Sequence, residues 1–159
     1  MSDTQYLAAK TIDEAVDAHA KANGSARFLA GGTDLLVQIK SGIRKPNLVI
    51  DIKKIVELNS IQEISENEFV IGASVSGANL NRNPKFAKLW PGVLEAFRLI
   101  GSEQIQGRAS LGGNLCICSD PISLNASKTP GQSLANLGFL LRFAPETEAP
   151  ITNSFSEIS

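Results

Sequence analysis

A glycine pair set between a strand pattern and a helix pattern constrains this chain more than any other feature. Residues 27–30 predict a short strand, the pair Gly31-Gly32 follows, and residues 35–42 carry apolar side chains at helical spacing. Residues 48–51 then predict a buried strand, so the segment has the pattern of a compact β-α-β unit with parallel strands. Glycines at such a turn allow a ligand to approach the backbone and its N–H groups closely.

A second glycine pair, Gly112-Gly113, follows the apolar segment 109–111 much later in the chain. Taken alone, the first pair could be a plain turn between strand and helix, and the second could be a bulge or tight bend. Neither has the spacing of a Gly-x-Gly-x-x-Gly or Walker A loop. Two such turns together, however, predict a shared anionic ligand such as the diphosphate of a dinucleotide.

The polar residues beside both pairs fit this interpretation. Thr33 and Ser110 supply hydroxyl groups, and the carboxamide of Asn114 can donate and accept hydrogen bonds. Asp34 would repel a diphosphate unless its oxygens face backbone N–H groups as a helix cap, or face a ribose hydroxyl. We therefore expect Thr33 or Asp34 to cap the helix, and the second turn to present unhindered amides at Gly112 and Gly113.

The rest of the chain predicts an α+β fold whose N-terminal part is α/β. Thr11 and Glu14 have the spacing of a capping box, which places a helix start at Ile12. The remaining expected elements are the end of that helix at Gly24, a hairpin of 60–64 with 68–72, a short helix from Ser76 to Leu80 that ends at Asn83-Pro84, and a longer helix from Pro91 to Gly101.

Composition excludes several classes of function. The formal net charge over 159 residues is −1, so no basic surface for nucleic acid is expected. The sequence has neither an apolar stretch of about 18 residues nor a signal peptide, so we expect no membrane insertion. Cys116 and Cys118 are too close for an ordinary disulfide and are expected to be reduced, buried residues, which favours a cytoplasmic protein.

The sequence offers no catalytic or metal-binding group of its own. His19 is the only histidine and lies near the apolar stripe of the first helix, where a partly buried structural role is expected. Without a second histidine, neither a Ser-His-Asp triad nor a Cys/His zinc site is evident. Any reaction would therefore depend on an organic cofactor.

Both glycine segments resemble the FAD-contacting loops of the molybdopterin dehydrogenase FAD-binding family. The matching stretches are Ala30-Gly31-Gly32-Thr33-Asp34-Leu35 and Ser110-Leu111-Gly112-Gly113-Asn114. Segments 48–51, 69–73 and 105–109 are also similar, and the likeness covers about residues 5–118. The family contains the medium, flavoprotein subunits of carbon monoxide dehydrogenase and xanthine dehydrogenase type enzymes.

The resemblance implies an FAD-binding domain of the vanillyl-alcohol oxidase type, made of two subdomains. The α/β subdomain would span 1–55, the start of an incomplete α+β subdomain 56–121, and a divergent, poorly ordered tail 122–159. The residues that would contact FAD are Ala30, Gly31, Gly32, Thr33, Asp34, Ser110, Leu111, Gly112, Gly113 and Asn114.

By this resemblance, the chain would be the FAD-binding subunit of a molybdenum hydroxylase. Its partners would be a large subunit with the molybdenum cofactor and a small iron–sulfur subunit. Electrons would pass from the iron–sulfur clusters through the flavin to NAD⁺ or a quinone. The alternatives are a stand-alone flavin-dependent oxidoreductase and a truncated, non-catalytic fragment that does not hold flavin.

The likeness ends soon after the second glycine pair. In the family pattern, four residues separate Gly-Gly-Asn from Ser-Pro or Asp-Pro, and an aspartate stands three positions after the proline. Here five residues separate Asn114 from Asp120-Pro121, and Leu124 stands at the aspartate position. This departure, together with the loss of periodicity, motivates the hypothesis of a frameshift or truncation within 115–121.

Overall fold

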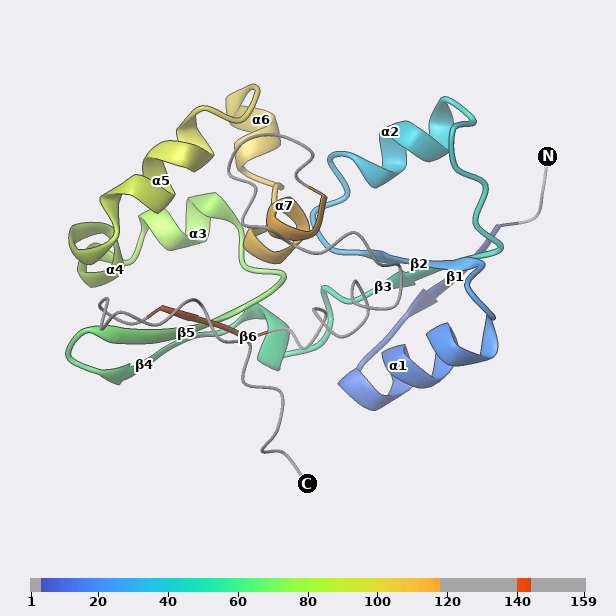
Figure 1. Cartoon of the computed structure of the whole chain (residues 1–159), viewed down its shortest axis with the longest axis horizontal. Helices are drawn as coiled ribbons and strands as arrows, with labels where there is room; N and C mark the ends of the chain where they lie inside the picture. Colours follow the sequence, from blue (N-terminus) through green and yellow to red (C-terminus); the bar gives the residue numbers. More distant parts are fainter. Residues whose placement is uncertain (1–3, 118–139, 144–159) are drawn as a thin grey trace.

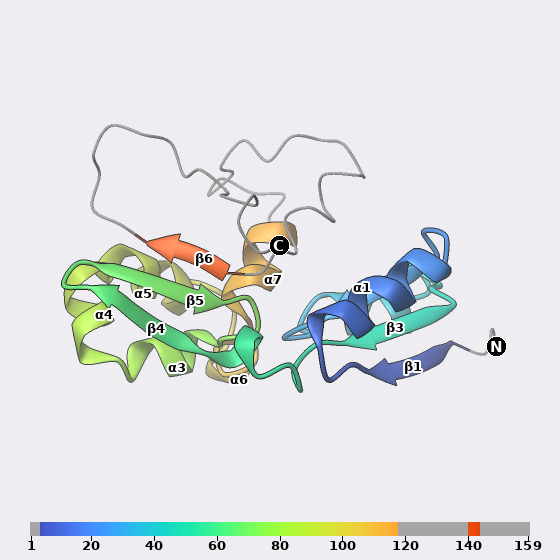
Figure 2. The same cartoon turned by 90° about the horizontal axis from the view of Figure 1, so that it is seen from below.

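Two small sheets, each covered by helices, make up the part of the chain that the computed structural model describes, residues 4–117 and 140–143. The first sheet is parallel and lies in the N-terminal half. The second sheet is antiparallel, and its helices gather on one face (Figures 1 and 2). Helix α7 (Leu111–Ile117) lies where the two halves meet (Figure 1).

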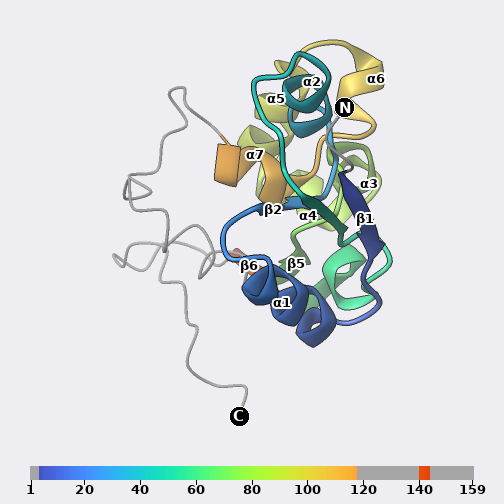
Figure 3. The same ribbon diagram turned by 90° about the vertical axis from the view of Figure 1, so that its right-hand side faces the viewer.

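The N-terminal half confirms the expected β-α-β unit. Strands β1 (Gln5–Ala8), β3 (Leu48–Asp51) and β2 (Ala26–Leu29) are parallel, in the order β1-β3-β2. Helix α1 (Ile12–Lys21) joins β1 to β2, and α2 (Leu35–Lys40) joins β2 to β3. Figures 1 and 3 show the two helices on opposite faces of this sheet.

Alternating side chains of β3 bury both faces of the parallel sheet. Ile50 packs with Ala15 and other residues on the α1 side, whereas Val49 packs with Leu35 on the α2 side. A strand covered on both faces carries a nearly continuous apolar run, as the segment Leu48–Asp51 does. Strand β1 was not predicted, because its four residues, Gln-Tyr-Leu-Ala, are few and carry no alternating pattern.

The ends of α1 follow the expected capping chemistry. The N–H of Glu14 donates to Oγ1 of Thr11 at 3.2 Å, as a capping box requires. In a capping box the Glu14 carboxylate would accept from the N–H of Thr11. Here it accepts from the N–H of the preceding residue, Lys10, at 2.7 Å. The helix ends before Asn23 and Gly24, which both adopt positive φ.

The second half contains the predicted hairpin and one further strand. Strands β4 (Ile61–Ser65) and β5 (Glu68–Gly72) pair antiparallel, and β6 (Leu140–Phe143) pairs antiparallel with β5 on its other side. The helices on this sheet are α3 (Gly77–Asn81), α4 (Pro84–Leu89), α5 (Pro91–Arg98) and α6 (Glu103–Gln106). Outside β6, the predicted tail 122–159 lies beyond the described residues.

An aromatic cluster fixes helix α4 on the antiparallel sheet. The ring of Phe69 on β5 lies edge-on to Phe86 and Trp90, with centroid distances of 5.6 Å and 5.7 Å. The preceding helix ends before Asn83-Pro84, as expected, and the same two residues begin α4, which was not predicted. Oδ1 of Asn83 accepts from the N–H of Phe86 at 2.9 Å, which caps the new helix.

A buried carboxylate joins the two neighbouring strands β1 and β3. The Tyr6 hydroxyl donates to Oδ2 of Asp51 at 2.5 Å, and Nζ of Lys53 lies 2.9 Å from the same oxygen. Burial alone would raise the pKa of Asp51, but the hydrogen bonds from Tyr6 and Lys53 outweigh it and hold the pKa below 3.8. The ionised form therefore stabilises this sheet.

We expect Asp51→Asn to lower the free energy of unfolding by about 2 kcal/mol at neutral pH. A carboxylate whose pKa is lower in the folded than in the unfolded state stabilises the folded protein fully when the pH is above its unfolded-state pKa. That stabilisation is lost as the pH falls through its folded-state pKa. In urea titrations, the difference between wild type and variant should thus be full at neutral pH and shrink as the pH falls below 3.8. The exposed Asp17→Asn is the control, and a difference that persists at the acid end would contradict this role of Asp51.

No helix in residues 4–117 and 140–143 is long and apolar enough to cross a membrane.

Candidate functional site

The first glycine turn lies at the carboxyl end of the parallel sheet. Residues 30–34 connect β2 to α2, and Gly32 adopts φ +75°, a left-handed conformation that other residues rarely take. A Cβ atom on Gly32 would also lie 2.9 Å from Cδ1 of Leu29. Open α/β sheets bind ligands at this edge, because the strand ends expose loops there.

The two glycine segments meet in space, as the sequence predicted. A Cβ atom on Gly31 would lie 2.2 Å from the carbonyl oxygen of Arg108 and 2.9 Å from the amide nitrogen of Ser110. The first turn thus packs directly on the backbone that leads into the second, with no room for a side chain. Figure 1 shows this turn, just before α2, beside α7.

Backbone hydrogen bonds hold the second segment against the connection between β5 and α3. The N–H of Leu111 donates to the carbonyl of Val75 at 2.9 Å, and that of Gly112 donates to Ala73 at 3.0 Å. A Cβ atom on Gly112 would lie 2.6 Å from Cβ of Ala73. Gly112 therefore allows two backbones to approach closely, and this approach places the second segment beside the first turn.

The expectation of unhindered amides in the second segment was wrong. Leu111–Ile117 forms helix α7, so the glycine pair lies inside its first turn and not in a loop. The N–H of Gly112 is bonded to Ala73, and the N–H of Gly113 donates to Oγ of Ser110 at 3.1 Å. The other polar groups of this segment are the hydroxyl of Ser110, a residue that is 2% exposed, and the carboxamide of Asn114.

The first turn, by contrast, does present free amides. Within residues 4–117 and 140–143, no acceptor pairs with the N–H groups of the five residues from Gly31 to Leu35. The next amide, that of Leu36, donates to the carbonyl of Gly32 at 3.3 Å. Residues 31–34 are only half-buried, so these donors can bind an anion or water.

Asp34 does not cap α2 with its side chain, contrary to one of the two expected arrangements. Its Oδ2 instead accepts a hydrogen bond from Nε2 of Gln38, one turn further along the helix. Oε1 of Gln38 in turn accepts from Nε of Arg44 at 2.6 Å. Because the carboxylate is bonded to Gln38, it leaves the amides of the turn unpaired.

Two buried polar atoms near the second segment lack a hydrogen-bond partner in the described part of the chain. They are Nδ2 of Asn114 and Oγ of Ser74. Buried polar atoms without a partner are rare in native proteins, and a bound ligand or water would satisfy both of these. No sequence pattern pointed to Ser74, which becomes relevant only because residues 73–75 pair with 111–112.

His19 has the structural position that the sequence predicted. It is half-buried, and its ring stacks on Phe28 with a centroid distance of 4.8 Å and an interplanar angle of 9°. Burial lowers its pKa, and the nearby Arg27 guanidinium lowers it further. Cys118 and Asp120, like the side chain of Cys116, lie outside the described residues.

Comparison with known proteins identifies the group of proteins to which this arrangement belongs. Residues 2–129 match the family of the FAD-binding domain in molybdopterin dehydrogenase. The chain is 35% identical over 120 residues to the nicotinate dehydrogenase FAD-subunit of Eubacterium barkeri, a match that covers 75% of this chain and 40% of the relative. It is 34% identical to the carbon monoxide dehydrogenase medium chain of Hydrogenophaga pseudoflava, covering 70% and 38% of the two chains.

Solved structures give the same result. A carbon monoxide dehydrogenase from Hydrogenophaga pseudoflava, in a form that lacks the Mo-pyranopterin moiety, matches with a TM-score of 0.67 and 34% identity over 71% of this chain and 39% of the other. Quinoline 2-oxidoreductase from Pseudomonas putida 86 matches with a TM-score of 0.66 and 25% identity, with the same coverage. The chain spans about two fifths of the length of these relatives. The chain belongs to the FAD-binding domain family of the molybdopterin dehydrogenases.

Proposed function

We propose that the turn 30–34 and the start of α7 together bind the diphosphate of FAD. The observation that supports this most is the contact of Gly31 with the backbone of Arg108 and Ser110, which packs the turn with its free amides against the segment that leads into α7. The residues fit the cofactor because the site combines unpaired donors with glycines that leave the backbone open.

The expected contact residues have different roles in this proposal. The amides of Gly31, Gly32, Thr33 and Asp34 would donate to phosphate oxygens, since no described residue accepts from them. Ser110 already accepts from Gly113, so its hydroxyl hydrogen remains available for donation. Nδ2 of Asn114 would become satisfied on binding. The other expected contact residues, Ala30, Leu111, Gly112 and Gly113, would act by shaping and packing the site.

The wider assignment extends this proposal to the complex. When bound, FAD supplies one- and two-electron redox chemistry that no side chain provides. We propose that the chain is the flavin-binding part of a molybdenum hydroxylase of the vanillyl-alcohol oxidase fold type. An iron–sulfur small subunit would supply electrons, a molybdenum-cofactor large subunit would oxidise the substrate, and NAD⁺ or a quinone would be the acceptor. A cytoplasmic location remains a prediction.

Flavin retention tests the proposal most simply. The purified chain, incubated with FAD and desalted, should keep close to one FAD per chain, measured from visible absorbance against protein content. A folded chain, as judged by circular dichroism, that stays colourless would contradict FAD binding. Co-purification with an iron–sulfur subunit would then distinguish a subunit of a complex from a stand-alone flavoprotein.

A further inference from the structure

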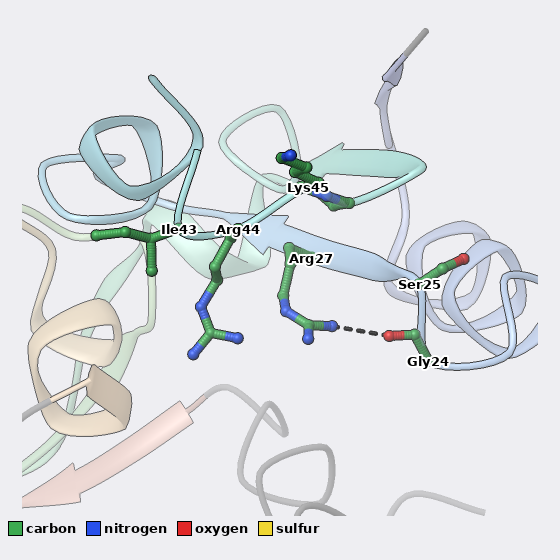
Figure 4. Close-up of a pocket in the computed structure, with 7 residues that line it drawn as sticks. Gly24, Ser25, Arg27, Ile43, Arg44 and Lys45 are labelled. Carbon is green, nitrogen blue, oxygen red and sulfur yellow. Dashed lines mark hydrogen bonds between the residues drawn. The ribbon is translucent and has the colours of Figure 1, made fainter. Parts of the chain in front are cut away.

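A second polar pocket lies at the end of β2 opposite the glycine turn (Figure 4). It has a volume of about 290 Å³ and lies between Gly24 and Ser25, which precede β2, and the connection 43–46 that leads into β3. Arg27 of β2 also lines it. None of these residues belongs to the proposed diphosphate site.

Two arginines face the same side of this pocket. Figure 4 shows the guanidinium groups of Arg27 and Arg44 extending in the same direction, whereas the side chain of Lys45 extends away from them. Arg27 Nη1 donates to the carbonyls of Gly24 at 2.9 Å and Ala26 at 2.6 Å. Arg44 Nε donates to Oε1 of Gln38 at 2.6 Å. These bonds orient both side chains through neutral partners.

Neither charge is neutralised within the described part of the chain. No carboxylate there forms an ion pair with Arg27 or Arg44, and the remaining guanidinium N–H groups have no acceptor. Two fixed guanidinium groups at one pocket favour an anion, and their planar donor geometry matches phosphate oxygens.

We propose that Arg27 and Arg44 bind a phosphate group of a second ligand, separate from the FAD diphosphate. Arg27 lies within β2 and Arg44 lies in the connection to β3, so neither residue belongs to the turn 30–34. FAD carries a single diphosphate, so one flavin cannot fill both sites with phosphate. The volume of about 290 Å³ lies near the lower limit of ligand pockets, which is about 300 Å³. A pocket of this size suits a phosphate or diphosphate group and part of a nucleotide.

The source of the phosphate is either a pyridine nucleotide acceptor or a small free phosphate. The suggestion that the phosphate belongs to a pyridine nucleotide acceptor rests on the function proposed above. The proposal of a phosphate site at Arg27 and Arg44 does not. The probe is inorganic pyrophosphate, titrated by calorimetry into the full chain saturated with FAD. NADH competition then separates the sources: competition supports the nucleotide, and its absence supports the free phosphate.

Matched variants test the site. Arg44→Gln and Arg27→Gln should each weaken pyrophosphate binding about ten- to a hundredfold, because each removes a charged donor. Lys45 also lines the pocket, but its side chain extends away from the two guanidinium groups, so Lys45→Gln should change the affinity by less than about threefold. Arg44 is exposed, so its variant is expected to fold even where Arg27→Gln does not.

Three results would overturn the proposal: no pyrophosphate binding, equal weakening by Lys45→Gln and Arg44→Gln, or displacement of pyrophosphate by FAD. If the chain binds no FAD, the proposed function fails by itself. The pyrophosphate affinities of Arg44→Gln and Lys45→Gln, measured on the flavin-free chain, then still test the phosphate site.

Discussion

Replacing Gly31 with alanine is expected to abolish flavin retention and to destabilise the fold. The new Cβ atom would lie 2.2 Å from the carbonyl oxygen of Arg108, a backbone atom that cannot rotate away. The turn and the 108–110 segment would have to separate, at a cost of about 2–3 kcal/mol in the free energy of unfolding. Because both proposed donor groups depend on that contact, FAD affinity should fall by at least about a hundredfold.

Gly92→Ala is the matched control for this substitution. Gly92 lies in the first turn of α5, where a new Cβ atom would meet nothing within 4 Å, and its φ is not positive. In urea unfolding, Gly92→Ala should therefore be as stable as wild type or slightly more stable, and its FAD affinity should be unchanged. If Gly31→Ala behaves like Gly92→Ala in both measurements, the two glycine segments do not pack as described.

Replacing Asn114 with alanine is expected to affect stability and flavin binding in opposite directions. Nδ2 of Asn114 is buried and unpaired in the described structure, so its removal relieves a desolvation penalty of about 1 kcal/mol. The flavin-free chain should thus be as stable as wild type or slightly more stable. FAD affinity should fall about tenfold or more, because the donor proposed for the cofactor is lost.

This opposite response distinguishes a binding residue from a packing residue. A residue that only packs would lower stability when truncated, and flavin binding would weaken as a consequence. Asn79→Ala on the exposed side of α3 is the control and should change neither quantity by much. Loss of stability in the flavin-free Asn114→Ala chain would contradict the proposed role of Asn114.

Local patterns were sufficient to predict the elements that form around the first turn. The apolar run Leu48–Asp51, the capping residue Thr11 and the glycine pair after β2 each act over a few residues, and the structure follows them. The hairpin of β4 and β5 is likewise a local feature. The meeting of the two glycine segments was predicted only because the two sequences suggested one ligand.

Helix α7 and its occupied amides could not be predicted in the same way. Two adjacent glycines disfavour a helix by about 1 kcal/mol each relative to alanine, so the sequence favours a loop there. Long-range hydrogen bonds from Leu111 and Gly112 to residues 73–75 reverse that preference. These contacts connect segments far apart in the chain, and no local pattern indicates them.

Helix α4 was missed for a different reason. Asn83-Pro84 can end one helix or begin the next, and the choice depends on whether an apolar face follows that can be buried. Phe86 and Trp90 provide this face by packing on Phe69 of β5. The partner strand, and not the Asn-Pro pair, decides the outcome.

The most direct test of a shared diphosphate site is an amide titration of the full chain with FAD, followed by nuclear magnetic resonance. The backbone N–H signals of Gly31, Gly32 and Thr33 and the side-chain amide of Asn114 should shift together, with one dissociation constant. Signals that move at only one of the two segments, or with different dissociation constants, would contradict a single diphosphate bound between them.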